Sequence, residues 1–125
     1  MSGPLDSVTG ALVGKALDVS LATHQTIANN IANASTPGYR PLKIDFEEVM
    51  GRVRSAVESG ADDDSIRSLL AGVDATPEQD PEATSVLLDR QMIWLAKNTT
   101  HYQALLRAQS QFGSLMSTAI KGGRG

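Results

Sequence analysis

Histidines and carboxylates are the side chains of this 125-residue chain that could support catalysis or bind a metal ion. Each of the two histidines, His24 and His101, lies in an apolar periodic stretch, and His24 has no second ligand four residues further on. The run Asp62-Asp63-Asp64 lacks the alternating aspartates, glycine and distal glutamate of a calcium loop, and suits a helix N-cap or a solvated charge cluster. The absence of cysteine excludes thiol catalysis and cysteine-based zinc sites. We predict that the protein is not an enzyme and has no cofactor, metal ion or small-molecule substrate.

A turn sequence, Thr36-Pro37-Gly38-Tyr39, is the most informative local feature of the chain. Pro37 keeps the residue before it out of the helical region, so a preceding helix must end at about Ser35. Proline at the second position and glycine at the third predict a type II turn in which Gly38 has a positive φ. Tyr39 follows at once and can fold back on the helix that has just ended.

Asparagines precede this turn at positions 29, 30 and 33. Asparagine is a poor helix former that favours caps and turns, and Asn30 and Asn33 share one helix face because they are three residues apart. One interpretation is a polar helix end that faces solvent. The other is a set of buried amides that fix the register between packed helices, since a buried amide left unpaired costs about 1–3 kcal/mol.

Two long helices, predicted over residues 5–35 and 83–120, would position these residues. Thr84, Ser85 or the acidic residues before them can cap the second helix. In each helix, apolar residues recur at spacings of three and four, as in a coiled-coil seam, and a second apolar stripe runs beside the first. We predict a mainly α fold in which the two helices pair as a coiled-coil-like hairpin. The residues expected to pack or assemble are Leu17, Leu21, Ile31, Leu88, Met92, Leu95, Tyr102, Leu106, Met116 and Ile120.

The chain is thereby divided into an N-terminal helix (1–35), a turn with a variable middle segment (36–82) and a C-terminal helix (83–125). The middle segment is expected to be irregular and partly mobile. It offers a short amphipathic helix after Arg52 and a second over residues 65–71, whereas proline and acidic residues over 72–82 suggest a linker.

Charge placement favours an assembled protein. Of the 25 charged residues, 16 lie between Arg40 and Glu82, and only seven lie in the two helical stretches 5–35 and 83–120. A helix with one side in water normally carries charges there, so each long helix is expected to contact protein on more than one face. If the first seam binds the partner helix, the second stripe of the N-terminal helix awaits a neighbour, and folding is coupled to assembly. That stripe is Leu12, Ala16, Val19, Thr23 and Thr26.

The net charge of −3 gives no reason to expect nucleic acid as a partner. The first residues have neither the basic nor the apolar region of a cleavable signal peptide, so export is expected to proceed without one. The charge-free stretch from residue 19 to residue 39 is interrupted by polar side chains and is not a membrane span.

The segment Asn30-Ile31-Ala32-Asn33-Ala34-Ser35-Thr36-Pro37-Gly38-Tyr39 resembles the N-terminal signature of bacterial flagellar rod and hook proteins. The residues after it, from Arg40 to Met50, resemble the proximal rod members of that family. A second match, Asp89-Arg90-Gln91-Met92-Ile93-Trp94-Leu95-Ala96-Lys97-Asn98 with Tyr102-Gln103, is similar to their C-terminal pattern. Residues 51–82 match no pattern of the family.

The resemblance implies a structural subunit of the proximal rod, in the periplasmic part of the flagellar basal body. Such a subunit polymerises through its terminal helices into the shaft that transmits torque, after export by the flagellar type III pathway. The implied partners are further copies, other rod proteins, the rod-base adaptor, the membrane ring and the export gate. Phe46 and Met50 resemble the short element that the gate reads, although they could equally be an apolar staple. A soluble helical bundle acting as an adaptor or export chaperone is the alternative.

Overall fold

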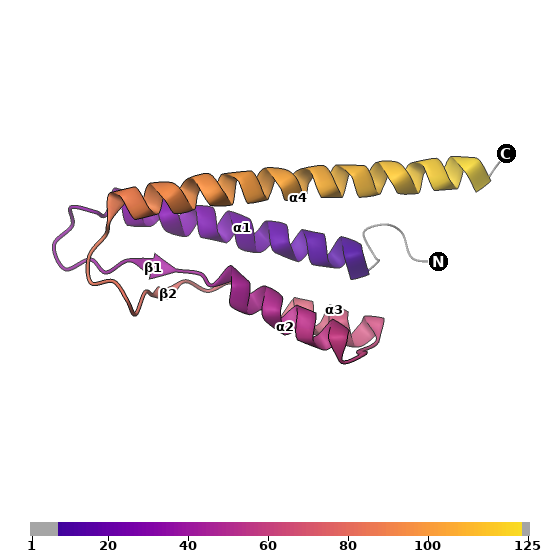
Figure 1. The fold of residues 1–125 in the computed structure, drawn as a ribbon, viewed down its shortest axis with the longest axis horizontal. Coiled ribbons are helices and arrows are strands. Elements are labelled where there is room, and N and C mark those ends of the chain that lie inside the picture. Colours follow the sequence, from indigo (N-terminus) through magenta and orange to yellow (C-terminus); the bar gives the residue numbers. More distant parts are fainter. Residues whose placement is uncertain (1–7, 124–125) are drawn as a thin grey trace.

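The computed structural model describes residues 8–123, apart from the side chains of Phe46, Phe112, Leu115, Met116, Ala119 and Ile120. Two long helices, α1 and α4, run antiparallel and pack side by side, and the rest of the chain lies on the other side of α1 (Figure 1). The predicted pairing of the terminal helices is confirmed. The elements in chain order are α1 (Val8–Ala32), β1 (Leu42–Lys43), α2 (Phe46–Glu58), α3 (Asp63–Gly72), β2 (Glu78–Gln79) and α4 (Leu88–Gly123).

Helix α1 ends at Ala32, three residues before the predicted end at Ser35. The amide of Asn33 still donates to the carbonyl of Asn29, but the next bonds tighten, with Ala34 donating to Ile31 and the Thr36 amide to the Asn33 carbonyl. The short Asn33 side chain also binds the carbonyl of Asn29. An asparagine side chain that satisfies a terminal carbonyl in this way favours an early end to the helix.

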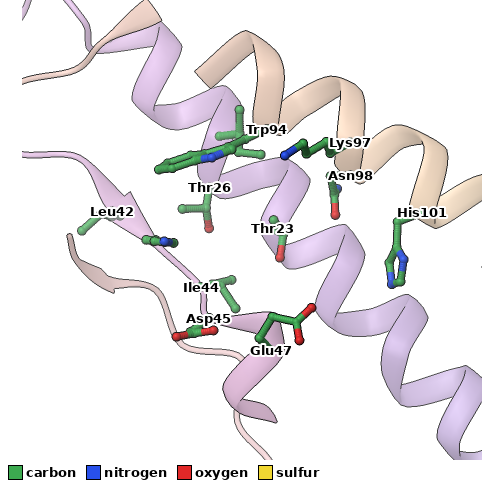
Figure 2. A pocket seen from close by; sticks show the side chains of 12 residues that line it. Thr23, Thr26, Leu42, Ile44, Asp45, Glu47, Trp94, Lys97, Asn98 and His101 are labelled. Carbon is green, nitrogen blue, oxygen red and sulfur yellow. The ribbon is translucent and has the colours of Figure 1, made fainter. Parts of the chain in front are cut away.

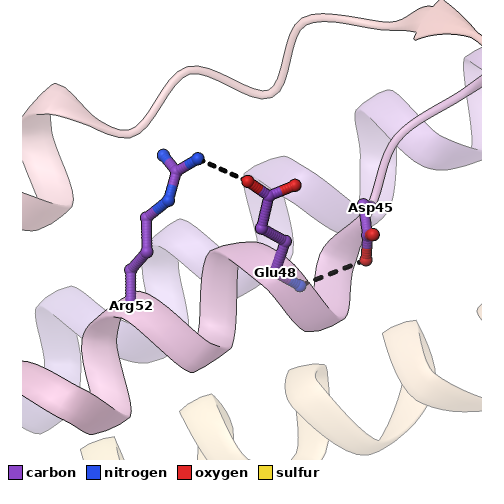
Figure 3. A network of polar contacts seen from close by, with 3 residues as sticks. All are labelled: Asp45, Glu48 and Arg52. Atoms are coloured by element: carbon purple, nitrogen blue, oxygen red, sulfur yellow. Dashed lines mark hydrogen bonds and ion pairs between the residues drawn. The ribbon is translucent and has the colours of Figure 1, made fainter.

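Helices α2 and α3 begin at acidic caps. The Asp45 carboxylate accepts a hydrogen bond from the amide of Glu48, and Glu48 forms an ion pair with Arg52 one turn later (Figure 3). The ion pair is exposed and adds little stability. At α3 the carboxylate of Asp62 accepts from the amide of Ser65, so the acidic run acts as an N-cap, one of the two predicted roles.

The buried apolar core lies between α1 and the middle segment. One cluster joins Val19 of α1 to Ile44, Val49 and Val73, and a second is formed by Val53, Ile66 and Leu70 with partly buried residues of α1 packed against it. The assignment of the two stripes of α1 therefore requires a correction. The second stripe, through Ala16, Val19 and Thr26, is already buried within the molecule because the middle segment covers it. The first seam follows Leu17, Leu21, His24, Ala28 and Ile31, and its residues Leu21, His24 and Ala28 are exposed.

Residues 72–82, interpreted from composition as a linker, include strand β2. It pairs antiparallel with β1, with Leu42 opposite Gln79 and Lys43 opposite Glu78. The pairing extends to Asp80, whose amide donates to the carbonyl of the fully buried Pro41. Two strands this short carry almost no periodic signal, so the pairing could not be recognised from the sequence.

Helix α4 begins at Leu88, five residues later than predicted, and neither Thr84 nor Ser85 caps it. Buried Asp80 instead holds a turn, accepting the amide of Glu82 on its carboxylate and the amide of Ala83 on its carbonyl. None of the helices within residues 8–123 combines the length and apolar character needed to cross a membrane.

Candidate functional site

Asn30 lies at the centre of a buried polar hub that connects α1, the turn, β1 and α4. Its side chain is fully buried. The amide oxygen accepts from the Tyr39 hydroxyl (2.7 Å) and the Leu42 backbone amide (2.9 Å). The amide nitrogen donates to the Leu42 carbonyl (2.8 Å) and to Oε1 of Gln91 on α4 (3.2 Å). Two accepted and two donated bonds use the full capacity of an asparagine amide.

The Asn30 side chain also closes the outer edge of β1. In an antiparallel pair the backbone groups of successive residues point alternately toward and away from the partner strand. Pro41 is bonded to Asp80 on the β2 side, so the groups of Leu42 point the other way, where the Asn30 amide exchanges two hydrogen bonds with them. The amide takes the place that a third strand would occupy, which protects an edge from unwanted pairing.

A second polar contact joins α1 to α4 further along the pair. The Ser20 hydroxyl donates to the amide oxygen of Asn98 (3.0 Å), and the amide nitrogen of Asn98 donates to the Ser20 carbonyl (2.9 Å). Gln91 is the one described side chain of α4 that is buried. The two long helices are therefore joined by a few well-placed amides and by partly buried apolar side chains such as Leu95, whereas the fully buried apolar core lies between α1 and the middle segment.

The remaining residues of the predicted turn motif lie outside the hub. Asn33 comes three residues after Asn30, a spacing that would place both on one helix face. Its side chain instead bonds locally to Asn29 and accepts from the Thr36 hydroxyl. Thr36, Pro37 and Gly38 are exposed. The amide of Tyr39 donates to the carbonyl of Thr36, and Gly38 has a φ of 78°, as the sequence predicts. The turn thus directs Tyr39 back to Asn30.

The Gly38→Ala substitution should destabilise the fold by about 1–2 kcal/mol, because a positive φ is unfavourable for any residue with a Cβ atom. No atom lies within 4 Å of the added methyl group, so the cost is purely conformational. Urea unfolding followed by circular dichroism measures it. The matched control is Gly14→Ala in α1, also free of contacts, which should be stabilising by up to ~1 kcal/mol. Destabilisation by both substitutions would contradict the explanation.

Burial raises the pKa of the Tyr39 phenol above its ordinary value of 10.0. A group whose pKa is raised on folding contributes stability that is fully present below the unfolded pKa and is lost as pH rises through the folded pKa. We expect the free energy of unfolding to decrease as the pH rises above the ordinary pKa of tyrosine. The decrease should be smaller in the Tyr39→Phe variant. Tyrosinate absorbance in a Tyr102→Phe variant isolates the titration of Tyr39. A titration at or below the ordinary value would be inconsistent with a partly buried hydroxyl that donates to Asn30.

The predicted packing residues fall into three groups. Leu17, Ile31, Leu95 and Tyr102 are partly buried. The side chains of Met116 and Ile120 lie outside the described residues. The others form an apolar flank along the helix pair, each with about half of its surface in water: Leu21 (48%), Leu88 (50%), Met92 (55%) and Leu106 (41%).

The two residues compared with an export-gate element lie at the start of α2. Met50 is partly buried and packs against the cluster of Val53, Ile66 and Leu70. Phe46 begins α2, and its side chain lies outside the described residues.

Ser20, Gln91 and Asn98 are site residues that sequence reasoning did not identify. One signal was present: Gln91 and Asn98 are seven residues apart within the second motif, so they occupy the same position of successive heptads. Polar residues at such a position fix the register of paired helices. Within residues 8–123, no group of three histidine, aspartate or glutamate side chains is arranged to hold a metal ion.

Comparisons with known proteins point to one family. The family model described as flagella basal body rod protein matches residues 24–40, the segment that contains Asn30 and the turn. Over 110 residues the chain is 34% identical to the flagellar basal body rod protein FlgB of Bacillus subtilis (strain 168), and the alignment covers 80% of this chain and 83% of that protein.

Proposed function

The chain belongs to the flagellar basal body rod protein family, and we propose that it polymerises through α1 and α4 as a subunit of the proximal rod. The observation that carries this proposal is the apolar flank. Large apolar side chains that stay half in water beside one another mark a surface that another molecule covers. Leu88 and Met92 are one turn apart on α4, and Leu21 of α1 is exposed along the same pair.

The energetics favour assembly over a self-sufficient bundle. Each large apolar side chain gains about 1.5–3 kcal/mol when it is fully buried. The four residues of the apolar flank realise only about half of that in the single chain, because about half of each surface remains in water. A neighbouring subunit would supply the rest, and repetition of one contact would build an open, tubular polymer.

The proposal extends to the route and neighbours of the subunit. The chain would leave the cytoplasm unfolded through the flagellar type III pathway, when Phe46 and Met50 are accessible to the export gate. It would then fold as it joins further copies, the other rod proteins, the rod-base adaptor and the membrane ring. In the periplasmic rod it would transmit torque, a role that requires stiff, laterally supported helices. Such support is what burial of the apolar flank would provide.

Circular dichroism of the purified chain over a dilution series, with a thermal melt at each concentration, tests the coupling of folding to assembly. We expect helicity and the melting temperature to rise with concentration, with association followed in parallel by sedimentation velocity. A sharp, concentration-independent melt of a chain that stays monomeric would instead indicate a self-sufficient helical bundle acting as an adaptor or chaperone.

A further inference from the structure

A pocket of about 210 Å³ lies between α1 and α4, in the middle of the apolar flank. The residues that line it are Leu21, His24, Asn98, Thr99 and Tyr102. Leu21 itself belongs to the apolar flank. Thr99 comes seven residues after Met92 and seven before Leu106, so these three residues lie on one side of α4. A neighbour that covers the apolar flank therefore also closes this pocket.

His24 is the side chain of this pocket that can change its charge near neutral pH. An imidazole ordinarily takes up a proton near pH 6.5, whereas a phenol such as that of Tyr102 is uncharged in this range. His24 is exposed in the single chain, so water solvates its imidazole in either form. Closure of the pocket by a neighbour would remove that water.

The polar groups around His24 supply no negative charge to balance an imidazolium. The amide of Asn98 exchanges two hydrogen bonds with Ser20, and the Thr99 hydroxyl donates to a carbonyl of its own helix. No carboxylate of the described residues lines the pocket. Asp18 comes six residues before His24, which places it about a third of a turn away around α1. A protonated imidazole in the closed pocket would be a buried charge without a counterion, which is strongly unfavourable.

The second histidine has different surroundings. His101 and Lys97 line a groove of about 410 Å³ between α1, α4 and the start of α2, together with the carboxylates of Asp45 and Glu47 (Figure 2). That groove lies toward the middle segment and not on the apolar flank. A proton gained by His101 is therefore placed near acidic side chains, and this residue provides a matched contrast to His24.

We propose that the apolar flank binds a neighbouring subunit only when His24 is uncharged, so that acid weakens assembly. The inference rests on the proposed polymerisation and adds a pH dependence to it. In an open polymer the flank of one copy meets a different surface of the next, so each contact buries one His24. An imidazole of ordinary acidity is neutral in about nine of ten copies at about pH 7.5 and in about one of ten at about pH 5.5. Association should therefore weaken about tenfold over this range.

Sedimentation velocity of the purified chain at about pH 7.5 and about pH 5.5 tests the proposal, with circular dichroism at each pH to follow folding. We expect the apparent dissociation constant to be about tenfold higher at the lower pH, with the helicity of dilute single chains unchanged. In His24→Gln, which stays neutral, the constant should change less than about twofold. The matched control is His101→Gln, which removes the other histidine and should keep the tenfold response.

A fixed charge supplies the second measurement. His24→Lys is charged at both pH values, so it should associate at least about tenfold more weakly than the unchanged chain at about pH 7.5 and show no pH response. A chain that associates without a pH response, or a response that survives in His24→Gln, would overturn the role of His24 and leave polymerisation standing. A response that is lost in His101→Gln would overturn it as well. A chain that never associates would remove both proposals.

Discussion

Replacing Asn30 with alanine should destabilise the folded chain by roughly 3–5 kcal/mol, which is near the upper limit for a single substitution. The change leaves the Tyr39 hydroxyl, both backbone groups of Leu42 and the amide of Gln91 without their partner. Each buried polar group left unpaired costs about 1–3 kcal/mol, and those at the edge of the hub recover part of this from water. Since small domains have a total stability of about 5–15 kcal/mol, much of the chain would unfold at moderate temperature.

Asn33→Ala is the matched control, because it removes the same side chain from the same motif three residues further on. The bonds of Asn33 are exposed and local, to Asn29 and Thr36, so water can replace them. We expect a loss of less than about 1 kcal/mol by urea unfolding. Similar losses from the two variants would show that the buried hub does not determine the stability of the fold.

The contrast between the two asparagines shows which features of the site can be predicted from the sequence. The turn residues correctly predicted the positive φ of Gly38, whereas the helix spacing of Asn30 and Asn33 did not apply, because α1 ends at Ala32. Which asparagine is buried depends on Gln91, 61 residues further along the chain, and on a two-residue strand at Leu42. Neither contact leaves a local pattern, so both had to come from the structure.

For the same reason, the sequence could not show which of the two apolar stripes of α1 is buried within the molecule. Apolar periodicity identifies the stripes, but it does not say which element covers each of them. Val19 and Ile27 are buried because α1 also packs against the middle segment, whose core residues, such as Ile44 and Ile66, are spread among charged ones. The many charged residues of this segment led to the prediction of an irregular segment. In the structure it contains two short helices, α2 and α3, each of which buries one narrow apolar face.

Substituting aspartate at both Leu88 and Met92 should abolish assembly while leaving the isolated chain folded. Both side chains are at least half exposed, so their replacement should change the free energy of unfolding by no more than about 0.5 kcal/mol. An aspartate at Leu88 even suits the first turn of a helix. In a polymer that covers the apolar flank, each loss removes about 1.5–3 kcal/mol of burial and adds an unpaired charge. Association should weaken more than a hundredfold.

Swimming in soft agar and electron microscopy of isolated basal bodies, in a strain whose only copy carries the variant, measure the effect on the rod. The matched single substitutions are Met92→Asp on the apolar flank and Val57→Asp on α2, since the two residues are 55% and 52% exposed. Both add one charge to a half-exposed apolar position, so only location distinguishes them. If both abolished swimming equally, the defect would follow from charge or export and not from the apolar flank. Normal swimming of the double variant would require a different face of the helix pair to hold the rod together.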